Sequence, residues 1–385
     1  MKGIRFIIFF AILFSLCYTP LSAQMPRPGS QDWWYTLEQG KQKFRQGNYG
    51  DALFTFEDAR RQRRTMYERM ERYLIDLLSI PEVRRLGDSL DWVERYIDEC
   101  RYADAADALK ELYYRIPKER FNNSASAALS ALSSLKDYPE AEYWIGETFL
   151  AEGEMGLALS QFQKTLNMRH LLENPGFSTE LMYKIAGIHR IRQEYNEMER
   201  ILLSILAADS LWSDNKTETQ ENVQPVSFEQ QALKRTLEKD GINRFITLYR
   251  YNNAECEQAH RLLGYYYYVS GRHNRAQNHL MFSFLIQNTV IINELIRRQY
   301  DFTFTNLEAL AAEFTQNRLI SDYIEKQEYY KTAYYLASSL YANGNASPAR
   351  GIWNFLSVQT HSGEWRNRAL SQLRSPRVEQ AVEMP

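Results

Sequence analysis

The sequence predicts an all-α fold, an irregular α-solenoid of helical hairpins with extra helices between the hairpins. Three observations predict it. One pattern of small and apolar residues recurs along the chain. Chain breakers are scarce, with 17 glycines and 11 prolines in 385 residues. Apolar residues make up 44% of the chain, and large amphipathic rings are common, with 26 tyrosines. Few breakers and many large side chains favour long helices over short strands.

The repeated pattern is a set of six positions separated by 7, 2, 3, 4 and 3 residues. Four clear copies begin at Gly40, Gly146, Gly264 and Ala337, and two weaker copies begin at Val93 and Ala186. This spacing describes a helical hairpin, because small residues allow two helices to cross closely and a turn glycine can adopt positive φ. The small residues expected at crossings and turns are Gly40, Gly47, Ala52, Ala105, Gly146, Gly153, Ala158, Gly264, Gly271, Ala276, Gly344 and Ala349.

These hairpins resemble the tetratricopeptide repeat (TPR). The segments "LEQGKQKFRQGNYGDALFTFEDA", "IGETFLAEGEMGLALSQFQKTL", "LLGYYYYVSGRHNRAQNHLMFS" and "LASSLYANGNASPARGIWNFL" carry the resemblance, and Pro117 matches the family's closing proline. However, the anchor positions, five alanines and Met198, are separated by 53, 53, 40, 78 and 73 residues. An uninterrupted array would repeat every ~34 residues. Extra helices are therefore expected between hairpins, for example over residues 61–79 and 291–325.

The first 23 residues have the organisation of a signal peptide. Lys2 and Arg5 precede an apolar run over residues 6–16, and Ala23 offers a small residue for cleavage before Gln24. The run is too short to span a bilayer, which needs ~20 residues, and no transmembrane helix is expected in the mature chain. The signal looks bacterial, so we expect a periplasmic protein. A lipid anchor at Cys17 remains an alternative, because a cysteine that ends an apolar run can mark a lipoprotein.

A polar stretch over residues 209–226, closed by Pro225, is interpreted as a linker. It would separate an N-terminal lobe, residues 24–208, from a C-terminal lobe, residues 227–374, with a mobile tail over residues 375–385. The alternative is a long loop inside a single solenoid.

The sequence holds no motif for a cofactor or a catalytic centre. It lacks a phosphate-binding glycine loop, a His-Glu-x-x-His motif and a Gly-x-Ser-x-Gly motif. The net charge of −2 gives no reason to expect nucleic acid as a partner. Cys256, His260 and His273 come nearest to a metal set, but no second spaced pair accompanies them, so we expect no metal. Whether Cys100 pairs with Cys256 stays open.

The resemblance implies a function as well as a fold. In TPR proteins the first helix of each hairpin lines a concave groove, and tyrosine and arginine are frequent anchors at interfaces. The residues expected in such a groove are Trp34, Lys41, Arg45, Tyr143, Tyr183, Arg190, Arg261, Tyr265, Tyr268, Lys331, Tyr334 and Tyr341. The chain is therefore interpreted as an exported, non-catalytic scaffold that binds a protein or peptide partner of the cell envelope.

Two alternatives remain. The first is a lipid-tethered structural accessory of an outer-membrane assembly or transport complex. The second is a cell-wall enzyme using acids of the segment 291–325, which contains Glu294, Asp301, Glu308 and Glu313.

The mature N-terminus distinguishes the soluble form from the tethered form. We expect mass spectrometry of the protein from its native host to find Gln24 as the first residue. A diacylated Cys17 at the N-terminus would show instead that the protein is lipid-anchored.

Overall fold

Each copy of the repeated pattern coincides with two consecutive helices of the computed structural model. The structure describes residues 33–85, 87–113, 119–172, 176–207, 209, 212 and 228–379. The helix pairs are α2 (Trp33–Arg45) with α3 (Tyr49–Leu78), α5 (Asp88–Asp98) with α6 (Tyr102–Tyr113), α8 (Pro139–Ala151) with α9 (Met155–Asn167), α10 (Phe177–Ile191) with α11 (Tyr195–Leu206), α14 (Ala254–Val269) with α15 (His273–Arg298), and α18 (Tyr329–Ala342) with α19 (Ala346–Val358). The expected all-α fold of helical hairpins is confirmed for the described residues.

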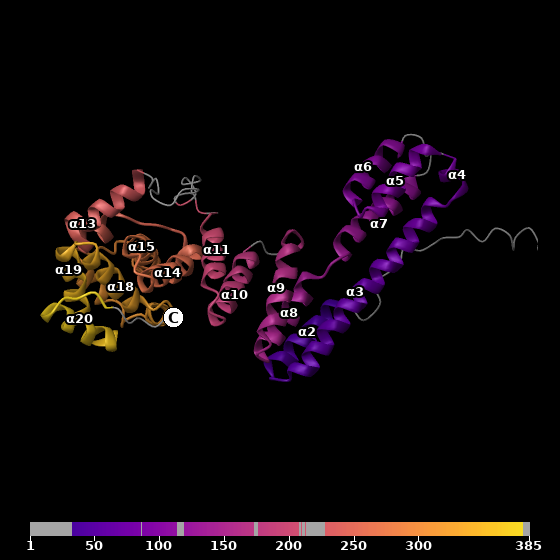
Figure 1. Cartoon of the computed structure of the whole chain (residues 1–385). Coiled ribbons are helices and arrows are strands. Elements are labelled where there is room, and N and C mark those ends of the chain that lie inside the picture. Colours follow the sequence, from indigo (N-terminus) through magenta and orange to yellow (C-terminus); the bar gives the residue numbers. More distant parts are fainter. Residues whose placement is uncertain are drawn as a thin grey trace, which may run out of the picture. The chain divides into compact units, whose positions relative to one another are not determined.

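The described helices form two units, one up to Ser178 and one from Thr179 onward (Figure 1). The boundary therefore precedes the linker expected over residues 209–226. The reason is that α11 packs against α14, so the fourth hairpin belongs to the second unit. Residues 1–32, Pro117, almost all of the expected linker and residues 380–385 lie outside the described part.

The turn of every hairpin has the same backbone geometry. The turn glycines have φ of +79° at Gly47, +83° at Gly153, +73° at Gly271 and +86° at Gly344. In the two weaker copies Cys100 and Gln193 adopt φ of +57° and +60°, which is unfavourable for residues with a Cβ. Each turn is closed by a bond from the next backbone N–H to a carbonyl five residues earlier, for example 3.0 Å from Asn48 to Lys43.

The two helices of a hairpin cross closely at glycine and alanine residues, which have no side chain or only a methyl group. A Cβ added to Gly40 would lie 2.4 Å from Phe56, one on Gly146 2.7 Å from Phe162, and one on Gly264 2.5 Å from Leu280. The alanines of the second helices are fully buried at these crossings; they are Ala52, Ala105, Ala158, Ala276 and Ala349. The hairpins can close this tightly only with residues of that size.

In the first unit the long helix α3 replaces the separate helix expected from residue 61. Its sequence contains neither glycine nor proline between residues 52 and 78, so nothing ends the helix earlier. Its first half packs on α2 and α8, and the helix also packs on α7 (Glu119–Leu135) (Figure 1). The second half contributes Met70 and Leu74 to a core shared with α7, which supplies Leu129 and Leu132. The short helices α4 (Pro81–Arg84) and η1 (Arg169–Leu171) complete this unit.

In the second unit α15 is the central helix and packs on both α14 and α18. It extends to Arg298, and the rest of the helical region expected up to residue 325 consists of α16 (Leu307–Ala311) and α17 (Arg318–Lys326). The remaining elements are α13 (Phe228–Leu248), η2 (Thr360–Ser362) and α20 (Glu364–Arg374). By length and hydropathy α15 could cross a membrane, contrary to our expectation, but most of its side chains are buried inside the unit.

The close crossings predict opposite effects for two glycine substitutions. Gly264→Ala should destabilise the second unit by about 1–3 kcal/mol, because the new methyl group would overlap Leu280. Gly187→Ala, within α10, has nothing within 4 Å of the new Cβ and should stabilise by ~0.5–1 kcal/mol. Denaturant unfolding of both variants measures the difference. Equal effects would contradict the crossing geometry.

Candidate functional site

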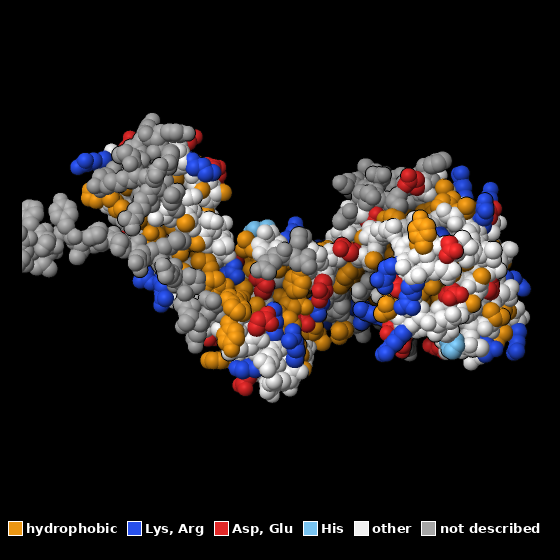
Figure 2. Space-filling view, turned by 180° about the vertical axis from the view of Figure 1, so that it is seen from behind, with side chains coloured by type: hydrophobic (Ala, Val, Ile, Leu, Met, Phe, Trp, Pro, Cys, Tyr) orange, Lys and Arg blue, Asp and Glu red, His pale blue; other side chains and the backbone are white. Residues whose placement is uncertain are grey.

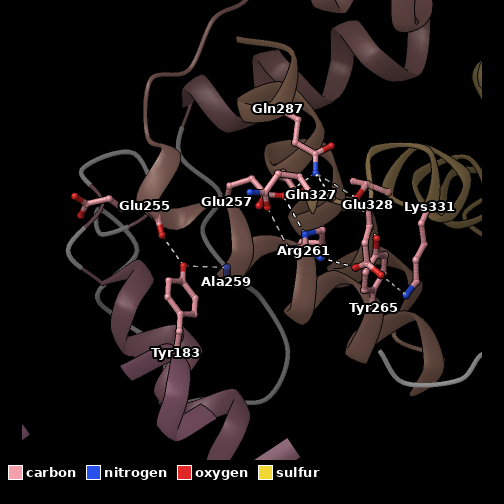
Figure 3. A network of polar contacts seen from close by, with 12 residues as sticks. Tyr183, Glu255, Glu257, Ala259, Arg261, Tyr265, Gln287, Gln327, Glu328 and Lys331 are labelled. Carbon is pink, nitrogen blue, oxygen red and sulfur yellow. Dashed lines mark hydrogen bonds and ion pairs between the residues drawn. The ribbon is translucent and has the colours of Figure 1, made fainter. Parts of the chain in front are cut away.

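The inner helices of the second unit, α14 and α18, carry a buried charged network (Figure 3). Arg261 lies between two carboxylates: its Nε donates to Glu257 over 3.2 Å and its Nη1 donates to Glu328. Glu257 also accepts bonds from Ser283 at 2.8 Å and Gln287 at 2.7 Å. These partners compensate two charges that would be costly to bury alone.

Lys331 and Tyr265 extend this network along α18 and α14. The Lys331 ammonium donates to Glu328 over 2.9 Å and lies 4.9 Å from the centroid of the Tyr265 ring. The Tyr265 hydroxyl bonds to Thr332 at 3.0 Å. Two acids and two bases therefore balance one another, which indicates a role in holding α14 against α18.

The environment shifts the pKa values of the two acids in opposite directions. Burial raises the pKa of Glu257, although the positive charge of Arg261 opposes the shift. Glu328 is also partly buried, but the hydrogen bond and charge of Lys331 and the charge of Arg261 hold its pKa below the ordinary value. Glu328 thus stays ionised between its two cations. It adopts this position with φ of +50°.

The structure brings several expected groove residues together but turns most of them inward. Tyr143, Arg261, Tyr265, Tyr268 and Tyr334 are each less than a tenth exposed, so the expectation that they line an open groove is wrong. Neighbouring helices cover these faces: α18 packs against α15, α19 and α20. The rings of Tyr143 and Tyr265 and the charge of Arg261 serve packing inside each unit.

The other expected groove residues differ in exposure. Trp34 and Arg45 are exposed, while Lys41, Tyr183, Arg190, Lys331 and Tyr341 are half-buried. The Lys41 ammonium lies 5.6 Å from the ring centroid of Trp144. The Tyr183 hydroxyl donates to the Glu255 carbonyl and accepts from the Ala259 N–H, so it binds the first turns of α14 (Figure 3).

An extended segment of the chain, Pro376–Glu379, lies on the outer end of α18. The Tyr334 hydroxyl donates to the Glu379 carboxylate at 2.7 Å, and the Tyr341 hydroxyl donates to the Pro376 carbonyl at 3.4 Å. Arg368 of α20 faces the same carboxylate at 3.8 Å. The expected mobile tail is therefore docked as far as Glu379.

Two further contacts hold this segment. The Arg377 backbone N–H donates to the Gln372 side chain at 2.9 Å, and Gln372 also donates to the Tyr334 hydroxyl at 3.2 Å. Burial raises the pKa of Tyr268 to about 12, and the negative charge of the nearby Glu379 carboxylate adds to this shift. Tyr334 and Tyr268 thus lie near the Glu379 carboxylate, while Tyr341 bonds to Pro376.

A cavity of about 660 Å³ lies between α17, the start of α18 and the η2–α20 segment. Its lining includes the carboxylates of Glu325, Glu328 and Glu364 and the rings of Tyr330 and Trp365. Lys331 is the one lysine or arginine in the lining. The Trp365 ring also contacts Tyr334, with 5.5 Å between centroids, so the cavity adjoins the docked segment.

A second cavity, of about 450 Å³, lies in the first unit between α3 and the α7–α8 region. Its basic lining residues are Arg60, Arg61, Arg63, Arg64, Lys136 and Lys164. The buried carboxylate of Glu142 binds both Arg60 and Lys164, and Arg64 pairs with Glu68 at 3.2 Å. Basic and acidic side chains are interspersed over the surface seen in Figure 2. These contacts pair three of the six basic lining residues with carboxylates.

The residues considered for metal binding and catalysis do not converge. His260 bonds to His279 at 3.1 Å, and burial lowers the pKa of His260 to about 3. Burial also raises the pKa of Cys256 to about 12. Within the described ranges no three metal-binding side chains cluster, and Cys100 and Cys256 are free thiols. Glu294 is paired with Arg297 and Arg298, and its hydrogen bond to Arg297 lowers its pKa.

The residues that pair with the expected groove residues of α14 and α18 were not identified from the sequence. Glu257 stands four residues before Arg261 among apolar residues, a signal for a buried helical pair that the sequence does contain. Gln372, Arg368 and Glu379 carry no local pattern, because their contacts join distant segments.

Comparisons with known proteins find relatives but assign no function to the chain. No protein-family model matches the chain. An uncharacterized protein of Treponema pallidum (strain Nichols) is 23% identical over 352 residues, covering 91% of this chain and 92% of its own length. An uncharacterized protein of Borreliella burgdorferi is 21% identical over 241 residues, which cover 58% of this chain and 70% of that protein. The crystal structure of the P58(IPK) TPR domain is 15% identical and covers 89% of this chain and 98% of its own, but a TM-score of 0.20 supports no structural argument.

The buried network predicts a large cost for removing its central cation. Arg261→Met should destabilise the second unit by about 3–5 kcal/mol, because Glu257 would be left buried without its charge partner. Arg297→Met removes an exposed cation from Glu294 and should change stability little. Urea unfolding compares the two variants, and equal midpoints would show that the network is solvated.

Proposed function

We propose that this chain is a non-catalytic scaffold that binds an extended segment of a protein partner along α18. The observation that carries the proposal is the docked segment Pro376–Glu379. Its contacts support the proposal, because they use hydrogen-bonding groups of this face that a partner peptide could use in the same way.

The chemistry of the face suits such a ligand. Tyr341 and Gln372 bind main-chain groups of the segment, a contact that any sequence can make. Tyr334 and Arg368 bind a side-chain carboxylate, which selects an acidic residue at one position. Rigid helices hold the tyrosines and the glutamine in place, so little entropy is lost when they bind a partner.

The signal peptide expected over the first 23 residues suggests where the proposed scaffold acts. We place the scaffold in the periplasm, as a soluble protein with a partner in the cell envelope. The alternative is a lipid-tethered accessory of an outer-membrane assembly or transport complex. Among the acids considered for a cell-wall enzyme, Glu294 is ion-paired, Asp301 and Glu308 are exposed, and Glu313 is half-buried.

A synthetic copy of the tail tests whether the face binds peptides. In the full-length protein the chain's own tail competes with any added peptide at a millimolar effective concentration. Glu379→Gln removes the charge that meets Tyr334 and Arg368, so the tail should dissociate more often. We expect a fluorescent peptide of residues 375–385 to bind this variant about tenfold more tightly than the wild type, measured by fluorescence polarisation.

Arg374→Ala serves as the control, because this exposed residue ends α20 beside the tail. It should bind the labelled peptide as the wild type does. A peptide that binds neither the wild type nor the Glu379→Gln variant would refute α18 as a binding face.

A further inference from the structure

The docked segment runs antiparallel to α18, and its last described residue, Glu379, bonds to Tyr334, whose ring contacts the cavity residue Trp365. Pro376 meets Tyr341 and Glu379 meets Tyr334. These tyrosines are seven positions apart in the helix, which corresponds to a rise of ~10 Å, and this is the length of three extended residues. One turn further along α18 stands Tyr330, which lines the cavity. A peptide that continued on the same path would enter it.

The lining of the cavity favours a positively charged side chain. It combines the carboxylates of Glu325, Glu328 and Glu364 with a single ammonium group, that of Lys331. Lys331 and Arg261 already neutralise Glu328. Glu325 is exposed, and Glu364 shares Arg368 with Glu379. The acidic excess therefore lies at Glu325 and Glu364.

Aromatic rings of the cavity provide a second interaction for a cation. Trp365 and Tyr330 both belong to the lining, and the Arg368 guanidinium already lies 4.9 Å from the centroid of the Trp365 ring. An ammonium or guanidinium group over an aromatic face is attracted to it, most strongly where water is reduced. The cavity thus offers a carboxylate and a ring to the same side chain.

We propose that this cavity is the subsite for a lysine or arginine of the partner segment. The inference rests on the proposed function and adds the partner's chemistry: an acidic residue in the place of Glu379, followed two residues later by a basic one. One turn of α18 is ~5.4 Å, which two extended residues cover. In the sequence Ala381 follows Glu379 by two residues, so a peptide with the chain's own sequence carries no charge at this position.

Three labelled peptides of residues 375–385 test the subsite against the full-length Glu379→Gln protein. One carries the natural Ala381, one Ala381→Lys and one Ala381→Glu. By fluorescence polarisation we expect the lysine peptide to bind about tenfold more tightly than the alanine peptide, and the glutamate peptide to bind more weakly than both.

A substitution of one lining residue tests whether the cavity causes the preference for the lysine peptide. Adding Glu325→Gln to the protein should remove most of the preference for the lysine peptide while leaving the alanine peptide unaffected. Glu308→Gln, which removes an exposed acid of α16 outside the cavity lining, should leave the preference intact. Thermal melts of both variants confirm that the fold persists.

The outcomes separate this inference from the proposed function. Equal affinities for the three peptides, or a lysine preference that survives Glu325→Gln, would overturn the subsite while α18 remained a peptide-binding face. Failure of all three peptides to bind would overturn both.

Discussion

The close crossing of two helices at a residue with little or no side chain is the contact on which each unit depends. At Gly40, Gly146 and Gly264 the partner side chain occupies the space that a Cβ would need. The facing alanines of the second helices are fully buried. Because this contact fixes the distance within each hairpin, it also decides which side chains are left to face the neighbouring helices.

In the second unit this packing converts an expected groove into a core. The central helix α15 packs on both α14 and α18, so polar residues on their inner faces must satisfy one another. The Glu257–Arg261–Glu328 network does so with compensated charges. The chain's own segment Pro376–Glu379 lies against Tyr334 and Tyr341 of α18.

The hairpins could be predicted from the sequence because their determinants are local. Crossing residues and turn glycines stand at fixed spacings, and even Cys100 and Gln193, without glycine's freedom, adopt the positive φ that the pattern requires. The length of α3 was harder to predict, since a change of packing partner within an unbroken helix leaves no local mark.

The site could be predicted only in part. The sequence indicated Tyr268, Tyr334 and Tyr341 as groove residues; Tyr334 and Tyr341 bond to the chain's own segment Pro376–Glu379, and Tyr268 is buried near it. It could not show that Tyr143 and Tyr265 are buried, because burial depends on which distant helices cover them. The docking of Glu379 against Arg368 likewise depends on a contact between segments with no shared pattern.

The docking of the chain's own segment on α18 is the central claim, and hydrogen exchange of one backbone amide tests it most directly. The Arg377 N–H donates to Gln372 at 2.9 Å, so its exchange in the full-length protein should be slowed well below that of an unstructured peptide. Glu379→Gln should accelerate it. Exchange of the Arg377 amide at the unstructured rate in the wild type would show that the segment does not occupy this face.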